Sequence, residues 1–199
     1  GRFVPYALAI VSAAFTLTIH PVGAVAAVAV VVGLRPMLRR LKSRRGDIGL
    51  WPILIPTTAS GLLVMYEIFA DQPIATILEG IEAQGVVGPT NKWSNEAMRW
   101  YILLNPTPDG SIARRVGIFV TILAVLLVVL VLVRKRNVSG VATAAVWRLV
   151  AVTGGAVAVL AFVPTKATHQ MGIFASLAGP LAAAATAFLQ PSIVRRRCN

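Results

Sequence analysis

Cysteine, histidine and acidic residues are scarce in this sequence. Among its 199 residues are one cysteine, two histidines and seven acidic residues, and only 13% are charged. Because Cys198 has no second cysteine to pair with, an internal disulfide is excluded, and nothing resembles the ligand spacing of a metal cluster. The sequence also lacks a phosphate-binding glycine-rich loop, a dinucleotide-binding glycine pattern and a nucleophile elbow. We therefore expect no metal, no cofactor and no nucleotide-dependent cytoplasmic chemistry.

Apolar residues dominate instead, at 57% of the chain, with a mean hydropathy of +0.77. This composition is typical of an integral membrane protein. A membrane-spanning helix needs about 20 mostly apolar residues, and we expect an all-α, polytopic bundle with about five to six such helices. Residues 7–34 are too many for one straight crossing, and His20-Pro21 predicts either a kinked helix or two short ones. The apolar segments are 7–34, 48–66, 116–133, 149–163 and 171–189.

The net charge of +12 would suit a nucleic-acid-binding protein, but the positions of the charges favour a membrane protein. Basic residues gather in three expected loops, 35–47, 134–148 and 190–199, which alternate with the apolar segments so that all three fall on one face. The positive-inside rule makes that face cytoplasmic, where the cations contact anionic lipid head groups. We therefore predict a multi-pass plasma-membrane protein without a nucleic-acid partner. Its largest loop, 67–115, then lies outside the cytoplasm.

The 67–115 loop contains two amphipathic stretches. The first follows Asp71, a possible helix cap, and places its isoleucines and leucine on one stripe between 74 and 81. The second, over 93–104, gathers Trp93 and Trp100 on one face with further apolar residues. Helices of this kind lie on a bilayer surface or pack on a membrane bundle, and tryptophan favours the interface. We expect interfacial anchoring here rather than stacking of the indoles on a sugar.

Two polar clusters next to the apolar segments are candidates for a binding site. Lys166 and His169 are three residues apart, so on a helical turn they would share a face. Arg114 and Arg115 precede the 116–133 segment, where each can reach a lipid phosphate or hold a substrate phosphate with its planar guanidinium. Ionisable groups at membrane depth indicate a functional site. We predict that an anionic, lipid-linked substrate binds His169, Lys166, Arg114, Arg115 and Thr165, with Asp109 and His20 as further candidates.

Five blocks of the sequence carry a resemblance to known proteins, namely residues 17–23, 33–36, 69–72, 109–115 and 164–169. They resemble one family, the actinobacterial cell-wall arabinosyltransferases of the Emb group. The resemblance covers nearly the whole chain, and its last two blocks are the most specific. It implies part of a GT-C type membrane glycosyltransferase that uses decaprenyl-phosphoryl-arabinofuranose. Such enzymes extend the arabinan of arabinogalactan or lipoarabinomannan outside the plasma membrane, and ethambutol targets them.

The resemblance also implies roles for particular residues. The family's lysine and histidine in the last block line the donor and drug pocket, and they correspond to Lys166 and His169. Its catalytic aspartate lies upstream of this chain, so we expect a fragment of a longer protein that contains no catalytic residue itself. The resemblance also implies that the complete protein forms a homodimer, or a heterodimer with another family member. Where the family usually has a tryptophan and a second histidine, this sequence has Ala167 and Gln170, which removes a stacking surface for a sugar.

Two other kinds of function remain open from the sequence. A broken apolar segment such as 7–34 also occurs in transporters with discontinuous helices. A non-catalytic scaffold subunit of a membrane complex is the other alternative, and the presence of Ala167 is compatible with it. A paired carboxylate in an early outer loop of the complete protein would favour the transferase, whereas two inverted repeats would favour transport.

Overall fold

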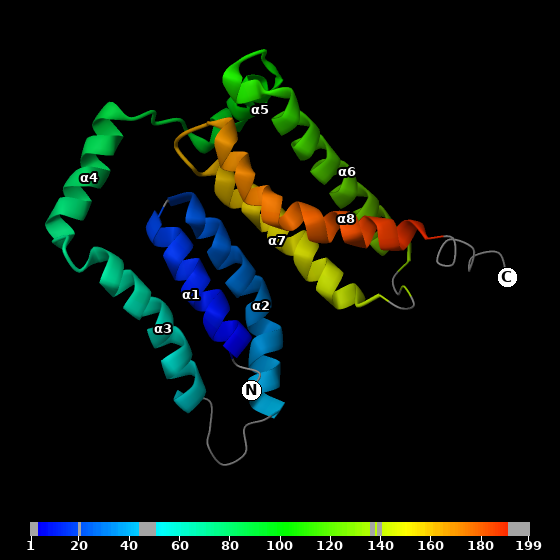
Figure 1. Cartoon of the computed structure of the whole chain (residues 1–199), viewed down its shortest axis with the longest axis horizontal. Coiled ribbons are helices and arrows are strands. Elements are labelled where there is room, and N and C mark those ends of the chain that lie inside the picture. Colours follow the sequence, from blue (N-terminus) through cyan, green and yellow to red (C-terminus); the bar gives the residue numbers. More distant parts are fainter. Residues whose placement is uncertain (1–3, 20, 44–50, 136–137, 139–140, 191–199) are drawn as a thin grey trace. The chain divides into compact units, whose positions relative to one another are not determined.

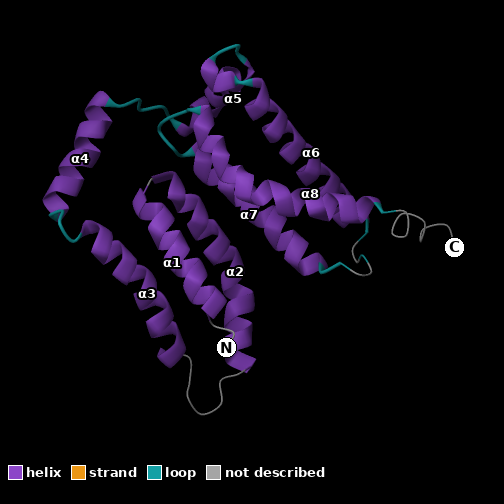
Figure 2. Cartoon of the chain, in the orientation of Figure 1, coloured by secondary structure: helices purple, strands orange, loops and turns teal. Residues whose placement is uncertain are grey.

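The described part of the chain is helical. The computed structural model describes residues 4–19, 21–43, 51–135, 138 and 141–190, and within these ranges it contains α-helices and short 3-10 helices but no strand (Figure 2). The all-α prediction is therefore confirmed. The chain divides into two compact units, one comprising residues 1–91 and 162–165 and the other residues 92–161 and 166–199. His20 and most of the 190–199 basic segment lie outside the described residues.

The first unit is built around helix α1. In Figure 1, α1 (Val4–Ile19) lies beside α2 (Ala24–Ser43) and α3 (Trp51–Phe69), and it packs against both. The approach of α3 is close at Gly61, where a Cβ atom would lie 2.7 Å from Cγ2 of Ile10 on α1. Small residues that let two backbones approach are typical of packed membrane helices.

A short 3-10 turn, η1 (Pro21–Gly23), separates α1 from α2. The turn is tight because a Cβ atom on Gly23 would lie 2.1 Å from the carbonyl oxygen of Thr16. The 7–34 segment is thus two helices rather than one kinked helix. Helix α2 continues through Pro36 to Ser43, into the basic 35–47 segment that was expected to be a loop. Lysine and arginine are good helix formers, which accounts for the continuation.

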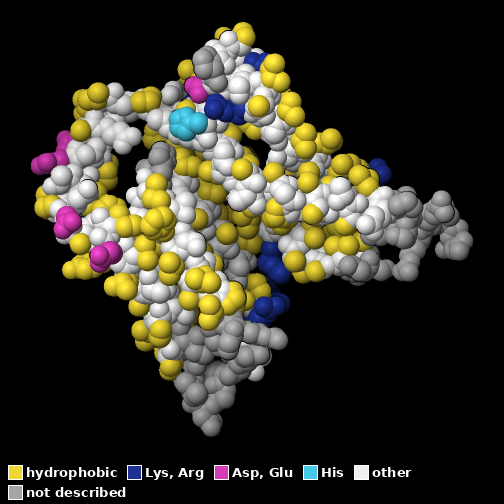
Figure 3. All heavy atoms as spheres, viewed as in Figure 1, with side chains coloured by type: hydrophobic (Ala, Val, Ile, Leu, Met, Phe, Trp, Pro, Cys, Tyr) yellow, Lys and Arg dark blue, Asp and Glu magenta, His cyan; other side chains and the backbone are white. Residues whose placement is uncertain are grey.

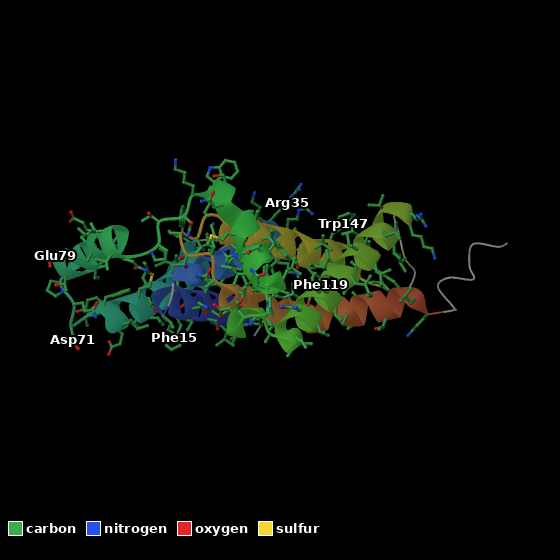
Figure 4. All side chains as sticks on the ribbon, turned by 90° about the horizontal axis from the view of Figure 1, so that it is seen from above. Phe15, Arg35, Asp71, Glu79, Phe119 and Trp147 are labelled. Atoms are coloured by element: carbon green, nitrogen blue, oxygen red, sulfur yellow. The ribbon has the colours of Figure 1, made fainter. Side chains whose placement is uncertain are left out.

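Helix α4 (Ile74–Val87) follows α3 after a short turn. Its N-cap is Pro73, without a side-chain cap bond, so the prediction that Asp71 caps this helix is wrong. Asp71 lies two residues before the N-cap, whereas a capping side chain must sit at the N-cap itself to reach the first free N–H groups. Leu78 and Ile81 are exposed on its apolar stripe. Acidic side chains lie on the α3–α4 part of the surface, and Asp71 and Glu79 reach away from the ribbon (Figures 3 and 4).

The second unit holds the largest apolar core. Helix α6 (Ile112–Arg134) packs against α8 (Ala175–Leu189), and α7 (Thr143–Ala161) packs against both. The core side chains of α6 and α8 recur every three or four residues, which places them on one stripe of each helix. Helix α7 begins before residue 149, so Arg148 belongs to a helix rather than to the predicted 134–148 loop. The buried core residues on α6 and α8 are Ala124, Val128, Leu132, Leu181, Ala185 and Phe188.

Three helical segments of the described chain have the length and apolar composition to cross a membrane. They are Ile112–Arg134, Thr143–Ala161 and Thr168–Leu189, while Val4–Ile19 and Leu54–Phe69 are apolar but shorter. The described residues thus contain three full-length candidates rather than the about five to six expected from hydropathy. The outer faces of these helices are apolar: Phe119 projects from α6 in Figure 4 and is 46% exposed. Such faces require lipid or further protein around them.

Candidate functional site

The candidate site centres on an irregular segment of the second unit. Lys166 and Ala167 are not helical, and a 3-10 helix, η4 (Thr168–Phe174), follows. Within this segment burial alternates along the chain: Lys166 and Gln170 are each 4% exposed and Thr168 is 0% exposed, whereas His169 is exposed. The expectation that Lys166 and His169 share a helical face is wrong, because the backbone at Lys166 is not helical. Lys166 points into the protein and His169 faces outward.

Arg99 is the most deeply buried charged residue of the described chain, with 0% exposure. It lies on α5 (Ala97–Leu104), which follows the 3-10 helix η2 (Trp93–Glu96). One terminal nitrogen of its guanidinium, Nη1, donates to the carbonyl oxygen of Ala167 at 2.7 Å and to Oε1 of Gln170. The other, Nη2, donates to the carbonyl oxygen of Leu160 at 3.2 Å. A single side chain therefore joins α5 to the end of α7 and to the start of η4.

Glu96 pairs with two buried cations. Its Oε1 accepts from Nε of Arg99 at 2.7 Å, and its Oε2 lies 3.2 Å from Nζ of Lys166. The Lys166 ammonium also donates to the carbonyl oxygen of Ala161 at 2.7 Å. Burial of a charge is costly unless the charge is paired and hydrogen-bonded, and both conditions are met here. The Lys166 ammonium is thus bonded to the Glu96 side chain and to the backbone of Ala161.

A second set of bonds joins η4 to the start of α6. Nη1 of Arg114 donates to Oγ1 of Thr168 and to the carbonyl oxygen of Asp109, both at 2.6 Å. It also lies 3.3 Å from Oδ1 of Asp109. The Thr168 hydroxyl in turn donates to the Asp109 carbonyl oxygen at 2.5 Å. The Arg114 side chain remains 32% exposed, so it combines an internal anchor with access from outside.

Arg115 takes a different direction from its neighbour. Its Nε donates to the carbonyl oxygen of Leu103 at 2.8 Å, and its Nη2 donates to that of Asn105 at 2.5 Å. These carbonyls lie at the C-terminal end of α5, where helix carbonyls lack partners within the helix and a cation is favourable. Arg115 therefore caps α5.

The 109–115 block begins α6. The Ser111 hydroxyl accepts from the backbone N–H of Arg114 at 3.4 Å, so Ser111 caps this helix. The N–H of the buried Gly110 approaches the Thr107 hydroxyl at 3.2 Å. A Cβ atom on Gly110 would lie 2.1 Å from the Asn105 carbonyl oxygen, so a side chain does not fit. The 109–115 block thus fixes the positions of Arg114 and, through the Asp109 carbonyl oxygen, of Thr168.

The structure separates the predicted site residues by the direction of their side chains. His169 and Asp109 are exposed, and Arg114 is partly exposed. Lys166 is buried, whereas Arg115 and Thr165 are half-buried. Among the described residues no three His, Cys, Asp or Glu side chains form a group that could hold a metal ion.

Sequence reasoning did not single out Arg99, Glu96, Thr168 or Gln170 as partners. The pattern that could have identified Arg99 lies on α5. The apolar stripe of the 93–104 stretch turns outward, with Trp93 and Tyr101 each 66% exposed, while Arg99 and Leu103 are buried. An arginine on the inward face of an amphipathic helix needs acceptors nearby, because its guanidinium stays charged.

Comparison with known proteins places these residues in a family. The model of the family described as "Mycobacterial cell wall arabinan synthesis protein" matches residues 1–199. The chain is 40% identical over 199 residues to the probable arabinosyltransferase B of Mycolicibacterium smegmatis, covering all of this chain and 18% of that protein. It is 36% identical over 189 residues to the probable arabinosyltransferase A of Mycobacterium tuberculosis, covering 94% of this chain and 17% of that protein.

The fold is also found in a solved structure. The cryo-EM structure of arabinosyltransferase EmbB from Mycobacterium smegmatis matches with a TM-score of 0.73 and 33% sequence identity. The match covers 96% of this chain and 16% of that protein. The chain therefore spans less than a fifth of the length of these relatives, and within that span the helical arrangement is similar.

Proposed function

Because the chain belongs to the family of mycobacterial cell wall arabinan synthesis proteins, we propose that it is part of a membrane arabinosyltransferase. The protein that contains it transfers arabinofuranose from decaprenyl-phosphoryl-arabinose to growing arabinan of arabinogalactan or lipoarabinomannan. Transfer takes place on the outer face of the plasma membrane. The enzyme is a dimer with a copy of itself or with another family member.

The observation that carries the proposal is the outward direction of His169 beside a partly exposed Arg114. Arg114 bonds Thr168, the residue before His169, so the two outward-facing donors are tied to one support. Both side chains offer N–H groups to a phosphate, and a guanidinium binds phosphate in a planar, two-pronged manner. Lys166 and Arg115 support the same site from within the second unit, through their bonds to Glu96 and to the end of α5.

The reaction requires stabilisation of a departing phosphate. A hydroxyl of the acceptor attacks the anomeric carbon of the donor, and the bond from that carbon to the phosphate oxygen breaks. The hydroxyl proton passes to a carboxylate in another part of the protein. Negative charge then grows on the polyprenyl phosphate, where His169 and Arg114 donate hydrogen bonds. A fixed donor aimed at developing charge contributes about 3 kcal/mol to lowering the barrier.

Replacement of His169 by alanine tests the proposal. In the full-length protein we expect His169→Ala to lower turnover by about 100-fold, because one fixed donor to the leaving phosphate is lost. The measurement is transfer of labelled arabinose from decaprenyl-phosphoryl-arabinose to a synthetic arabinoside acceptor. Lys92→Ala is the matched control, since Lys92 is an exposed cation of the same unit, and its turnover should be unchanged. Near-normal transfer by His169→Ala would contradict the assignment. Absence of transfer by the unaltered protein would favour a scaffold instead.

A further inference from the structure

We infer that Arg99 is a positioning residue for His169. Its guanidinium bonds the carbonyl oxygen of Ala167 on one side of His169 and the side chain of Gln170 on the other. The His169 side chain is thus exposed, whereas the segment that carries it is bonded to the buried Arg99 both before and after position 169. The catalytic consequence of this inference rests on the proposed function, but the fixed placement of His169 does not.

The bonds from Arg99 to Ala167 and Gln170 act as a clamp on the segment that carries His169. The local backbone explains why this clamp is needed. The residues before η4 are not helical, so no ladder of intrahelical bonds fixes the backbone at Ala167. The N-cap position of η4, Ala167, has no side chain that can bond the first N–H groups. Arg99 supplies bonds from 68 residues away in sequence to Ala167 and from 71 residues away to Gln170. The place of His169 therefore depends on a tertiary contact.

The chemistry of the clamp requires an arginine. Its planar guanidinium carries five N–H donors in a fixed fork, and here these bonds reach three separate acceptors as well as Glu96. A lysine ammonium is a point charge on a flexible stem and offers three donors without the fork. Gln170 suits the arginine because its amide oxygen accepts without adding charge. A protonated histidine at position 170 would place a second cation against the guanidinium.

The charged residues around Arg99 are also paired. Glu96 pairs with both Arg99 and Lys166, and Lys166 is bonded to the end of α7 through Ala161. Thr168 is bonded to a different set of groups, the Asp109 carbonyl oxygen and the Arg114 guanidinium. Four consecutive residues, 167–170, are therefore held at three of their positions, and only the His169 side chain is directed outward.

The test measures the placement of position 169 directly. Nitroxide labels are attached to cysteines introduced as His169→Cys and Ile112→Cys in a full-length protein that has no other cysteine. Double electron–electron resonance then gives the distribution of distances between the two labels. Ile112 is a suitable reference because it is 77% exposed at the start of α6. With Arg99 present we expect one narrow distribution. Arg99→Met should broaden it at least about twofold, and Arg99→Lys should have an intermediate effect, because charge without the fork bonds fewer acceptors.

Turnover is measured in parallel on unlabelled protein. We expect Arg99→Lys to lower kcat by about 10-fold to 100-fold, because small displacements of a catalytic group have effects of that size. KM for the donor should change much less, because Arg114, the other proposed phosphate donor, is anchored independently of Arg99. Arg134→Met and Arg134→Lys are matched controls, since Arg134 is an exposed arginine at the end of α6, and neither should change the distribution or the turnover.

Each outcome bears on the inference. An unchanged distance distribution in both Arg99 variants would overturn it, even if turnover fell. If Arg99→Met cannot be purified as folded protein, Arg99→Lys alone decides the result. If the distribution broadens but the unaltered protein transfers no arabinose, the placement of His169 by Arg99 stands and the proposed function fails.

Discussion

Individual charged residues of this chain differ most in whether they are directed inward or outward. Arg99 and Lys166 are buried and share Glu96 as their carboxylate partner. Removal of one partner from a buried ion pair leaves an uncompensated charge, which is far more destabilising than loss of a surface pair. The carboxylate common to both cations is therefore the most sensitive member of the set.

Neutralising Glu96 should destabilise the protein strongly. We expect Glu96→Gln to lower the free energy of unfolding by about 3 kcal/mol, because two buried cations lose their shared counter-charge. The measurement is denaturant titration of the purified protein in detergent, supported by the midpoint of thermal unfolding. Glu79→Gln is the matched control: Glu79 is exposed on α4, and its loss should change stability by less than about 0.5 kcal/mol. Equal effects of the two substitutions would contradict the role assigned to Glu96.

Among the structural elements, the turn before α6 determines where two site residues lie. The 3-10 helix η3 (Pro108–Gly110) brings the Asp109 carbonyl to both Thr168 and Arg114. Gly110 makes this turn possible, because carbonyl oxygens of Asn105, Ile102 and Leu103 surround the position that its Cβ would occupy. These contacts are with backbone atoms, which cannot move aside as a flexible side chain can.

A methyl group at Gly110 should disturb this turn. We expect Gly110→Ala to destabilise the protein by about 1–3 kcal/mol or more, through overpacking against backbone carbonyls. Gly117→Ala is the control, because no heavy atom outside its own helix lies within 4 Å of a Cβ built at Gly117. That substitution should be neutral or slightly stabilising, as alanine favours a helix interior over glycine. Thermal unfolding of the two variants checks the expectation, and a Gly110→Ala protein as stable as Gly117→Ala would refute it.

For the whole molecule, orientation in the membrane decides whether His169 can meet a lipid-linked sugar outside the cell. The three basic segments were predicted to face the cytoplasm. Apolar side chains cover much of the outer face of α6 (Figure 3). A chain with such faces contacts lipid or other membrane helices along most of its length.

Cysteine labelling tests the orientation. In spheroplasts that contain the full-length protein, a membrane-impermeant maleimide should label Ala113→Cys, because the start of α6 is expected outside. Ser43→Cys, at the basic end of α2, should be labelled only after lysis. Both positions are exposed, so the reagent can reach each one once it is on the correct side. Labelling of Ser43→Cys in intact spheroplasts would reverse the orientation and remove the basis for an outward-facing donor site.

What the sequence by itself determined is the helical, membrane-protein character of the chain, the interruption at Pro21 and the family. Hydropathy over about 20 residues and the backbone restriction of proline are local properties, so both can be read without a fold. Residue blocks such as 109–115 and 164–169 carried the resemblance that the family comparison then confirmed.

The tertiary structure alone decided which cations face inward. Around Pro164 the backbone is irregular, so helical spacing could not predict that Lys166 turns toward Glu96 while His169 turns outward. Apart from Glu96, the acceptors of Arg99 described above lie 61 to 71 residues further along the chain. The physical reason is that a buried charge takes its direction from the acceptors that packing brings to it, and no local pattern of residues contains that information.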